Sequence, residues 1–118
     1  MTLGFKDLIV WNKAMDLTVE IYDIVKLLPK EELFALSDQM RRSVISIPSN
    51  IAEGQARQHK KEFVHFLTIA KGSNSELETQ LLICIRLGYF TGERAKKALD
   101  MTDEINKMLS AMITKLRT

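Results

Sequence analysis

The chain has 118 residues, a formal net charge of +2 and 46% hydrophobic residues, which is ordinary for a soluble globular protein with one core. No apolar run approaches the roughly 20 residues that span a bilayer, and no signal-peptide pattern opens the chain. The single cysteine, Cys84, excludes an intrachain disulfide. We therefore expect one domain over residues 1–118, in the reducing cytoplasm and without a membrane segment.

The first helical pattern covers residues 7–28. Leu8, Trp11, Met15 and Tyr22 lie on one side of this helix, and further apolar residues continue the surface around it. At ~100° per residue the apolar arc covers roughly half the circumference, which is wider than one core contact needs. The arc is either buried between two helices of its own subunit or shared with another chain. Pro29 ends this helix.

The second helix is predicted to begin between residues 33 and 37 and to end at Gly54, a residue typical of helix C-termini. Its core stripe runs from Met40 to Ile51 at steps of three and four. Pro48 removes one backbone donor and crowds the preceding turn. Because the apolar spacing keeps its phase past Pro48, we expect one kinked helix rather than two.

A third helix is predicted from about Lys60 to Leu87, with Gly72-Ser73-Asn74-Ser75 at its middle. Ser73 and Glu76 have the spacing of a capping box, which would indicate a break. The apolar register continues across this segment, so we expect a single helix. Residues 88–92 form a turn into a fourth helix with a methionine-rich apolar seam of coiled-coil spacing. Four helices with short links predict an all-α, antiparallel up-down-up-down four-helix bundle.

Catalytic and metal-binding patterns are largely absent from the sequence. His59 and His65 fall on different helix faces, and no His-Glu-x-x-His pattern occurs. Glu76 and Glu78 are two residues apart and cannot share a helical face as an acid–base pair. Cys84 lies in an apolar register, which favours an inert core thiol. We expect no enzymatic activity, no metal and no cofactor.

A polar stripe on the second helix is predicted to form a structural seam. Ser46 and Asn50 are flanked by apolar positions, and buried polar groups require hydrogen-bond partners. Ser73, Asn74 and Glu76 of the third helix are the natural candidates. Arg41 or Arg42 is predicted to pair with Glu53, Glu76 or Glu78, which would fix helix register or a subunit contact. A polar ligand site is the alternative. The predicted seam comprises Arg41, Arg42, Ser46, Asn50, Glu53, Ser73 and Glu76.

Basic residues give the main indication of a partner. In an up-down-up-down bundle the N-terminus, the link between helices two and three, and the C-terminus lie at one end. The predicted nucleic-acid-binding residues there are Lys6, Lys13, Arg57, His59, Lys60, Lys61, Lys115 and Arg117. Arg94, Lys96 and Lys97 form a second cluster at the opposite end, where the helix dipole disfavours cations. Phosphates would suit either cluster; a merely solvated basic surface is the alternative.

Short motifs are spread over nearly the whole chain, with the fourth helix the least distinctive part. They are Trp11 with Ala14, Ile21-Tyr22, Leu28-Pro29, Glu32, Leu36, Gln39-Met40-Arg41-Arg42, Ser46 through Gly54, Phe63, Phe66-Leu67, Ala70 through Ser73, Glu76 through Leu81, and Leu87-Gly88-Tyr89. Together they resemble the small four-helix-bundle proteins encoded within intervening sequences of bacterial 23S ribosomal RNA genes.

The resemblance implies a cytoplasmic antiparallel bundle that assembles as a ring, most often a homopentamer, with no known enzymatic activity. The accessory protein of diversity-generating retroelements is similar; it is a basic pentamer that binds nucleic acid and a reverse transcriptase. This chain departs from that basic pattern by its net charge of +2, although five copies would carry about +10.

We therefore expect a non-enzymatic homo-oligomer, pentameric by the resemblance, that contacts structured RNA or another nucleic acid through its basic end. The alternative is an assembly module that recruits a protein partner without touching nucleic acid. The broad apolar arc of the first helix and the methionine-rich fourth helix motivate that alternative, because methionine suits adaptable contact surfaces.

Overall fold

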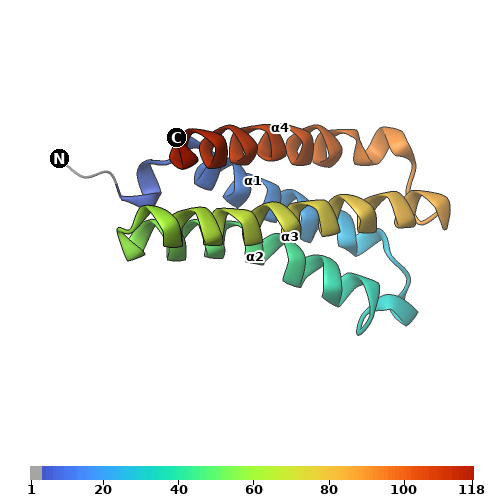
Figure 1. The fold of residues 1–118 in the computed structure, drawn as a ribbon. Helices are drawn as coiled ribbons and strands as arrows, with labels where there is room; N and C mark the ends of the chain where they lie inside the picture. The colour runs from blue at the N-terminus through green and yellow to red at the C-terminus, as the bar shows by residue number, and fades with distance from the viewer. Residues whose placement is uncertain (1–3) are drawn as a thin grey trace.

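The computed structural model describes residues 4–118 and contains four long helices. They are α1 (Ile9–Ile24), α2 (Leu36–Arg57), α3 (Lys60–Arg86) and α4 (Gly92–Arg117), with short 3₁₀ turns at Phe5–Asp7, Val25–Leu27 and Lys30–Glu32. The helices run up and down in an elongated bundle of 46 × 23 × 20 Å (Figure 1). No strand occurs within these described residues. The predicted all-α four-helix bundle is confirmed.

The first helix is shorter than predicted at both ends. Leu8 has an extended backbone, with φ −78° and ψ 128°, and α1 begins only after it. At the other end, Val25–Leu27 tightens into a 3₁₀ turn, and Leu28 is extended at φ −75° and ψ 147°. Leu28 directly precedes Pro29, whose ring excludes the helical conformation at the residue before it.

The second helix runs without interruption through Pro48, as the apolar phase predicted. In Figure 1 the N-terminal half of α2 diverges from the bundle axis, although its Met40 stays buried beside Cys84 of α3. Pro48 has no N–H with which to bond the preceding turn, and helices commonly bend at such a position. The bend leaves α1 and α2 less closely packed toward that end.

The predicted stop at Gly54 is wrong. The helix continues to Arg57 and ends at Gln58, which takes the left-handed conformation with φ 61°. Gly54 is instead buried in the last turns of α2, close against Phe63 and Phe66 of α3. A glycine is required there because α3 leaves no space for a side chain, and not because the helix ends.

The third helix is continuous from Lys60 to Arg86, so the capping-box spacing of Ser73 and Glu76 does not mark a break. Its buried positions include Leu67, Leu77 and Leu81, which meet the core stripes of the other helices. The predicted stripe of α2 is fully buried over its length, and Cys84 of α3 lies in the same core.

The apolar arc of α1 divides between core and surface. Val10, Leu17 and Ile21 are buried, whereas Val19 is 72% exposed and Met15 is 42% exposed. Part of the arc is therefore not covered by the other described residues of the chain. None of the helices in residues 4–118 is long and apolar enough to cross a membrane.

Candidate nucleic-acid interface

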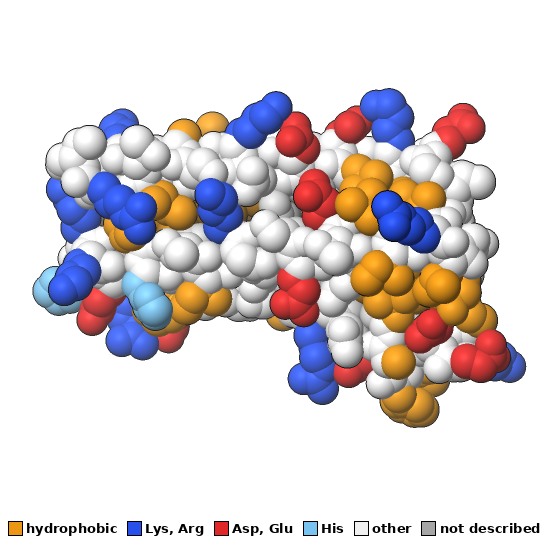
Figure 2. All heavy atoms as spheres, turned by 45° about the vertical axis from the view of Figure 1, so that its right-hand side comes forward, with side chains coloured by type: hydrophobic (Ala, Val, Ile, Leu, Met, Phe, Trp, Pro, Cys, Tyr) orange, Lys and Arg blue, Asp and Glu red, His pale blue; other side chains and the backbone are white. Residues whose placement is uncertain are grey.

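The predicted basic residues gather where the described N-terminal segment, the α2–α3 link and the C-terminal turn of α4 meet (Figure 1). Figure 2 shows Lys, Arg and His side chains concentrated at this end. We call this surface the basic end. Its members, all exposed, are Lys6, Arg57, His59, Lys60, Lys61, Lys115 and Arg117.

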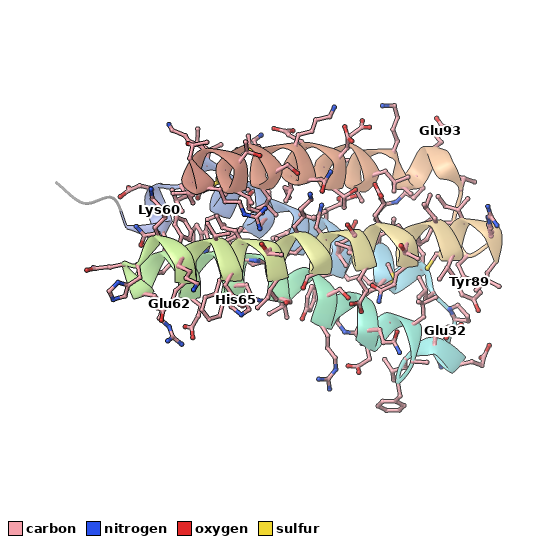
Figure 3. All side chains as sticks on the ribbon, in the orientation of Figure 1. Glu32, Lys60, Glu62, His65, Tyr89 and Glu93 are labelled. Atoms are coloured by element: carbon pink, nitrogen blue, oxygen red, sulfur yellow. The ribbon has the colours of Figure 1, made fainter. Side chains whose placement is uncertain are left out.

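The α2–α3 link brings its basic residues close together because it is short. Gln58 takes the left-handed conformation and His59 is extended, with φ −119° and ψ 127°, so α3 begins at Lys60. Figure 3 shows Lys60 at this tip of the bundle. The His59 side chain makes no capping hydrogen bond. Lys60 and Lys61 occupy a first helical turn, where the helix dipole disfavours cations, so helix stability does not explain their presence.

Two of the predicted basic residues form ion pairs with carboxylates of the chain. The guanidinium of Arg57 bonds Glu53 at 3.0 Å and lies over the ring of Phe66, 5.3 Å from its centroid. Lys13 forms an ion pair with Glu104 and so links α1 to α4. Five of the predicted cations make no ion pair with any residue of 4–118: Lys6, Lys60, Lys61, Lys115 and Arg117.

In the second basic cluster, Arg94, Lys96 and Lys97, two of the three cations form ion pairs within the chain. Arg94 bonds two carboxylates of α1, Glu20 at 3.1 Å and Asp23 at 2.9 Å. Lys96 bonds Asp100 at 2.8 Å, and this hydrogen bond raises the pKa of the lysine. Only Lys97 of the three has no ion pair within the described chain. The ion pairs of Arg94 hold α4 against α1, which explains why a cation occupies the start of α4.

The polar seam exists between α2 and α3. The hydroxyl oxygens of Ser46 and Ser73 lie 2.8 Å apart. Ser43 donates to Glu76 Oε1 at 3.1 Å, and Gln80 Nε2 donates to the same oxygen at 3.3 Å. Ser43 and Gln80 were absent from the predicted seam. Ser43 could have been included, because it belongs to the same polar stripe of the second helix.

Within one chain, the predicted arginine pairs of the seam are wrong. Arg42 bonds Asp38 at 2.9 Å, one turn earlier in its own helix, and Glu53 bonds Arg57. Arg41 makes no ion pair with any residue of the 4–118 segment. Arg42 and Glu53 each meet a partner one turn away on the exposed surface of α2, so neither needs a partner from α3.

The two asparagines also differ from expectation. Asn50 Nδ2 donates to the carbonyl and hydroxyl oxygens of Ser46, at 2.8 and 2.9 Å, within α2. Asn74 Nδ2 donates to the Thr102 carbonyl of α4 at 2.8 Å, so Asn74 faces away from the seam. Its Oδ1 and Gln80 Oε1 are buried atoms without a hydrogen-bond partner in the described chain.

A side-chain hydrogen bond closes the end opposite the basic end. Tyr89 donates to Glu32 at 2.7 Å, and this bond raises the pKa of the tyrosine (Figure 3). Nearby, Cys84 Sγ lies 3.7 Å from Met40 Sδ, and burial raises the pKa of its thiol to about 11. Among residues 4–118, no group of three or more His, Cys, Asp or Glu side chains is placed to hold a metal ion.

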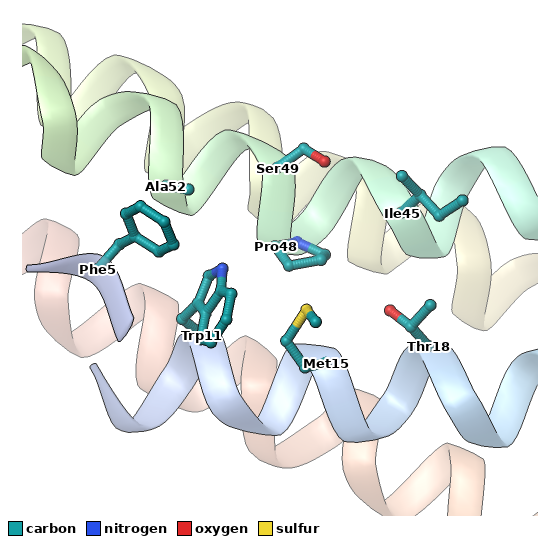
Figure 4. A pocket seen from close by; sticks show the side chains of 8 residues that line it. All are labelled: Phe5, Trp11, Met15, Thr18, Ile45, Pro48, Ser49 and Ala52. Carbon is teal, nitrogen blue, oxygen red and sulfur yellow. The ribbon is translucent and has the colours of Figure 1, made fainter. Parts of the chain in front are cut away.

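An apolar hollow of about 360 Å³ lies between α1 and α2 (Figure 4). The sequence pattern indicated no pocket there, only the broad arc of the first helix. Phe5 and Trp11 close one end in an edge-to-face contact, with ring centroids 5.2 Å apart. The full lining is Phe5, Trp11, Met15, Thr18, Ile45, Pro48, Ser49 and Ala52.

The fold and the sequence agree with one known family. The model of the 23S rRNA-intervening sequence protein family matches residues 6–111. A similar crystal structure is that of a protein with unknown function from the S23 ribosomal protein family of Bacteroides thetaiotaomicron. It has a TM-score of 0.82 and 33% sequence identity, over 89% of this chain and 98% of that chain. The comparison with curated proteins found no match. The chain belongs to the 23S rRNA-intervening sequence protein family.

Proposed function

We propose that this protein is a non-enzymatic homo-oligomer, a cytoplasmic pentamer, that binds structured RNA through its basic end. One observation carries the proposal: five cationic side chains at one end of the bundle make no ion pair within residues 4–118. They are Lys6, Lys60, Lys61, Lys115 and Arg117. Cations without an ion pair, grouped on one surface, suit the phosphate backbone of a nucleic acid. When they bind phosphates, they release the counterions condensed on the nucleic acid.

Oligomerisation would compensate for the small charge of one chain. A net charge of +2 supports only weak attraction to RNA. A ring would repeat the basic end in every subunit, and several linked contacts bind far more tightly than one. The family's name associates its members with 23S rRNA, which makes ribosomal RNA fragments the first choice of ligand.

A salt titration tests the proposal. Binding of labelled 23S rRNA fragments is measured by filter retention between about 50 and 200 mM salt, a range over which phosphate contacts weaken strongly. In the double variant Lys60→Ala/Lys61→Ala, the log–log salt slope is expected to fall by roughly 0.9 for each phosphate that the variant no longer neutralises.

The matched control removes two unpaired cations away from the basic end. Arg86→Ala/Lys97→Ala lowers the net charge equally and is expected to retain the wild-type slope. The RNA proposal fails if wild-type protein shows no salt-sensitive affinity below about 10 µM, within the range of ordinary non-specific binding. An equal decrease of the slope in both double variants would assign the effect to net charge rather than to the basic end.

A second candidate function is recruitment of a protein partner without nucleic-acid contact. Phe34 favours it, because this side chain is 90% exposed beside Leu33, 47% exposed, at the end opposite the basic end. Exposed aromatic side chains are typical anchors of protein interfaces. A pull-down after nuclease treatment tests this candidate. One protein retained by the wild type and absent with Phe34→Asp would support it, and recovery of nucleic acid alone would count against it.

A further inference from the structure

A long groove follows α1, with α2 lining its two ends and α1 with the turn after it lining its middle. The apolar hollow of Figure 4 continues into hollows of about 510 and 460 Å³, because neighbouring hollows share lining residues. Thr18 joins the first to the second, and Tyr22 and Lys26 join the second to the third. We call this surface the α1–α2 groove. On α1 it extends from Trp11 to Lys26, about 22 Å at 1.5 Å per residue.

The α1–α2 groove changes character along its length. Its middle presents exposed apolar side chains, with Val19 72%, Ile45 43%, Met15 42% and Tyr22 41% exposed. Toward the Pro29 turn it becomes basic. The cations lining that part are Lys26, Lys30 and Arg41.

Arg41 is the notable cation of the groove. It is half-buried, and no carboxylate in the described part of the chain forms an ion pair with it. Asp23, which also lines the groove, already bonds Arg94 and lies 3.8 Å from Lys26. An occupant that matches this groove needs an apolar ridge that carries a carboxylate.

The outer surface of α3 offers such a ridge. Ile69, Ile83 and Leu87 are 38%, 42% and 55% exposed, and their spacing places them on one helical face. Glu76 lies between them, seven residues from Ile69 and from Ile83. We call these four residues the α3 stripe; it spans about 27 Å at 1.5 Å per residue, close to the length of the groove. Figure 2 shows hydrophobic side chains at the surface toward the end opposite the basic end.

Glu76 retains an uncommitted oxygen. Both of its hydrogen bonds, from Ser43 and from Gln80, use Oε1. Within residues 4–118, Oε2 accepts none. The carboxylate can therefore accept a further cation without breaking the polar seam.

We infer that the α1–α2 groove of one copy receives the α3 stripe of a second copy of this chain. The inference rests on the proposed homo-oligomer and names the surfaces that form it. The groove is apolar and contains the unpaired Arg41. The stripe is apolar and contains Glu76, whose Oε2 is free to accept a hydrogen bond. Amphipathic helices bind apolar grooves in this way. A standard interface buries about 800 Å² per partner, roughly a tenth of the 7218 Å² accessible surface of this chain.

The contact joins two different surfaces, so it is heterologous. Repeated heterologous contacts close into a ring when the rotation per subunit divides a full turn. A groove-to-groove contact would instead be isologous. It would leave the α3 stripe in water and would supply no free carboxylate to Arg41.

Complementary blocking variants test the inference by size-exclusion chromatography with light scattering. Val19→Asp places a charge in the groove, and Ile83→Asp places one on the stripe. Each variant alone is expected to elute as a 13.5 kDa monomer. An equimolar mixture retains one intact groove and one intact stripe, so it is expected to give a dimer of about 27 kDa, twice the mass of one copy.

The matched control is Ile9→Asp, because Ile9 is 66% exposed on α1 outside the groove. It is expected to retain the wild-type mass. Circular dichroism checks that each variant folds, and Met15→Asp with Leu87→Asp forms a second pair with the same expected result.

The outcomes separate the inference from the proposed function. A monomeric wild type would overturn the homo-oligomer and this contact together. An oligomeric wild type whose blocking variants stay oligomeric would overturn only the assigned surfaces. Loss of assembly in Val19→Asp but not in Ile83→Asp would indicate a groove-to-groove contact, and a mixture that stays monomeric would also contradict the inference.

Discussion

Gly54 of α2 lies directly against Phe66 of α3. A Cβ atom added to Gly54 would be 2.7 Å from the Phe66 Cβ and 3.1 Å from the Phe63 Cδ1. The first distance is shorter than any ordinary carbon–carbon contact. The two helices approach here to a separation that leaves no space for a methyl group, beside the link that presents the basic end.

Alanine substitutions at Gly54 and Gly72 compare this close contact with a helical position that has free space around it. Gly54→Ala is expected to lower the free energy of unfolding by about 1–3 kcal/mol from overpacking, in spite of alanine's better helix propensity. Gly72→Ala is the control, because Gly72 is also helical but has no atom within 4 Å of the added Cβ. It is expected to stabilise by about 0.5–1 kcal/mol. Urea unfolding measures both; a stabilised Gly54→Ala would contradict the close approach.

The polar seam predicts different costs for removing the Ser46 hydroxyl and the Ser73 hydroxyl. Ser46 meets Ser73 and also receives a hydrogen bond from Asn50, whereas Ser73 meets Ser46. Ser46→Ala is expected to cost about 1 kcal/mol or more, and Ser73→Ala less. The double variant gives their coupling, expected at about 0.5–1.5 kcal/mol. Additive losses in equilibrium unfolding would show that the two hydroxyls do not interact.

Cys84 is expected to be inert in the folded protein. The thiol is fully buried, and burial raises its pKa to about 11, so the reactive thiolate is roughly one part in ten thousand at pH 7. Labelling with a thiol reagent should therefore proceed at the rate of unfolding. Rapid labelling of native protein that is as fast as in denaturant would contradict the buried position.

The same thiol predicts a dependence of stability on alkaline pH. Its pKa is raised from 9.0, so the folded state holds the proton more tightly than the unfolded state. The stabilising contribution is complete below pH 9 and is lost as the pH rises toward 11, by roughly 2–3 kcal/mol. Cys84→Ala, measured in parallel, should lack this part of the decline. Parallel stability curves for the two proteins would rule out the effect.

Arg94 is expected to act in stability rather than in RNA binding. Arg94→Ala removes the bonds to Glu20 and Asp23 and should cost about 1 kcal/mol, because it breaks a link between α4 and α1. Lys97→Ala, three residues away and without an ion pair in the described chain, should change stability by less than about 0.5 kcal/mol. Thermal unfolding compares the two variants, and RNA filter binding should be unchanged in both.

Apolar spacing alone determined the class of fold. The stripe from Met40 to Ile51 keeps helical phase through Pro48, and the register of the third helix continues through Gly72, so both helices are continuous. Periodicity reports which side of a helix is apolar, and four such sides joined by short links leave few arrangements other than a bundle. The grouping of basic residues at one end followed from the same topology.

Only the tertiary structure decided which residues meet. Ser43 reaches Glu76 across 33 positions of sequence, and Arg94 reaches Glu20 across 74. Asn74 turns to α4 although its neighbour Ser73 faces α2. Helical periodicity fixes a residue's angle on its own helix, but it does not fix the rotation or the distance of the neighbouring helix. For that reason the sequence showed a polar stripe and a wide apolar arc, and only the folded chain showed the seam, the Gly54 contact and the α1–α2 groove.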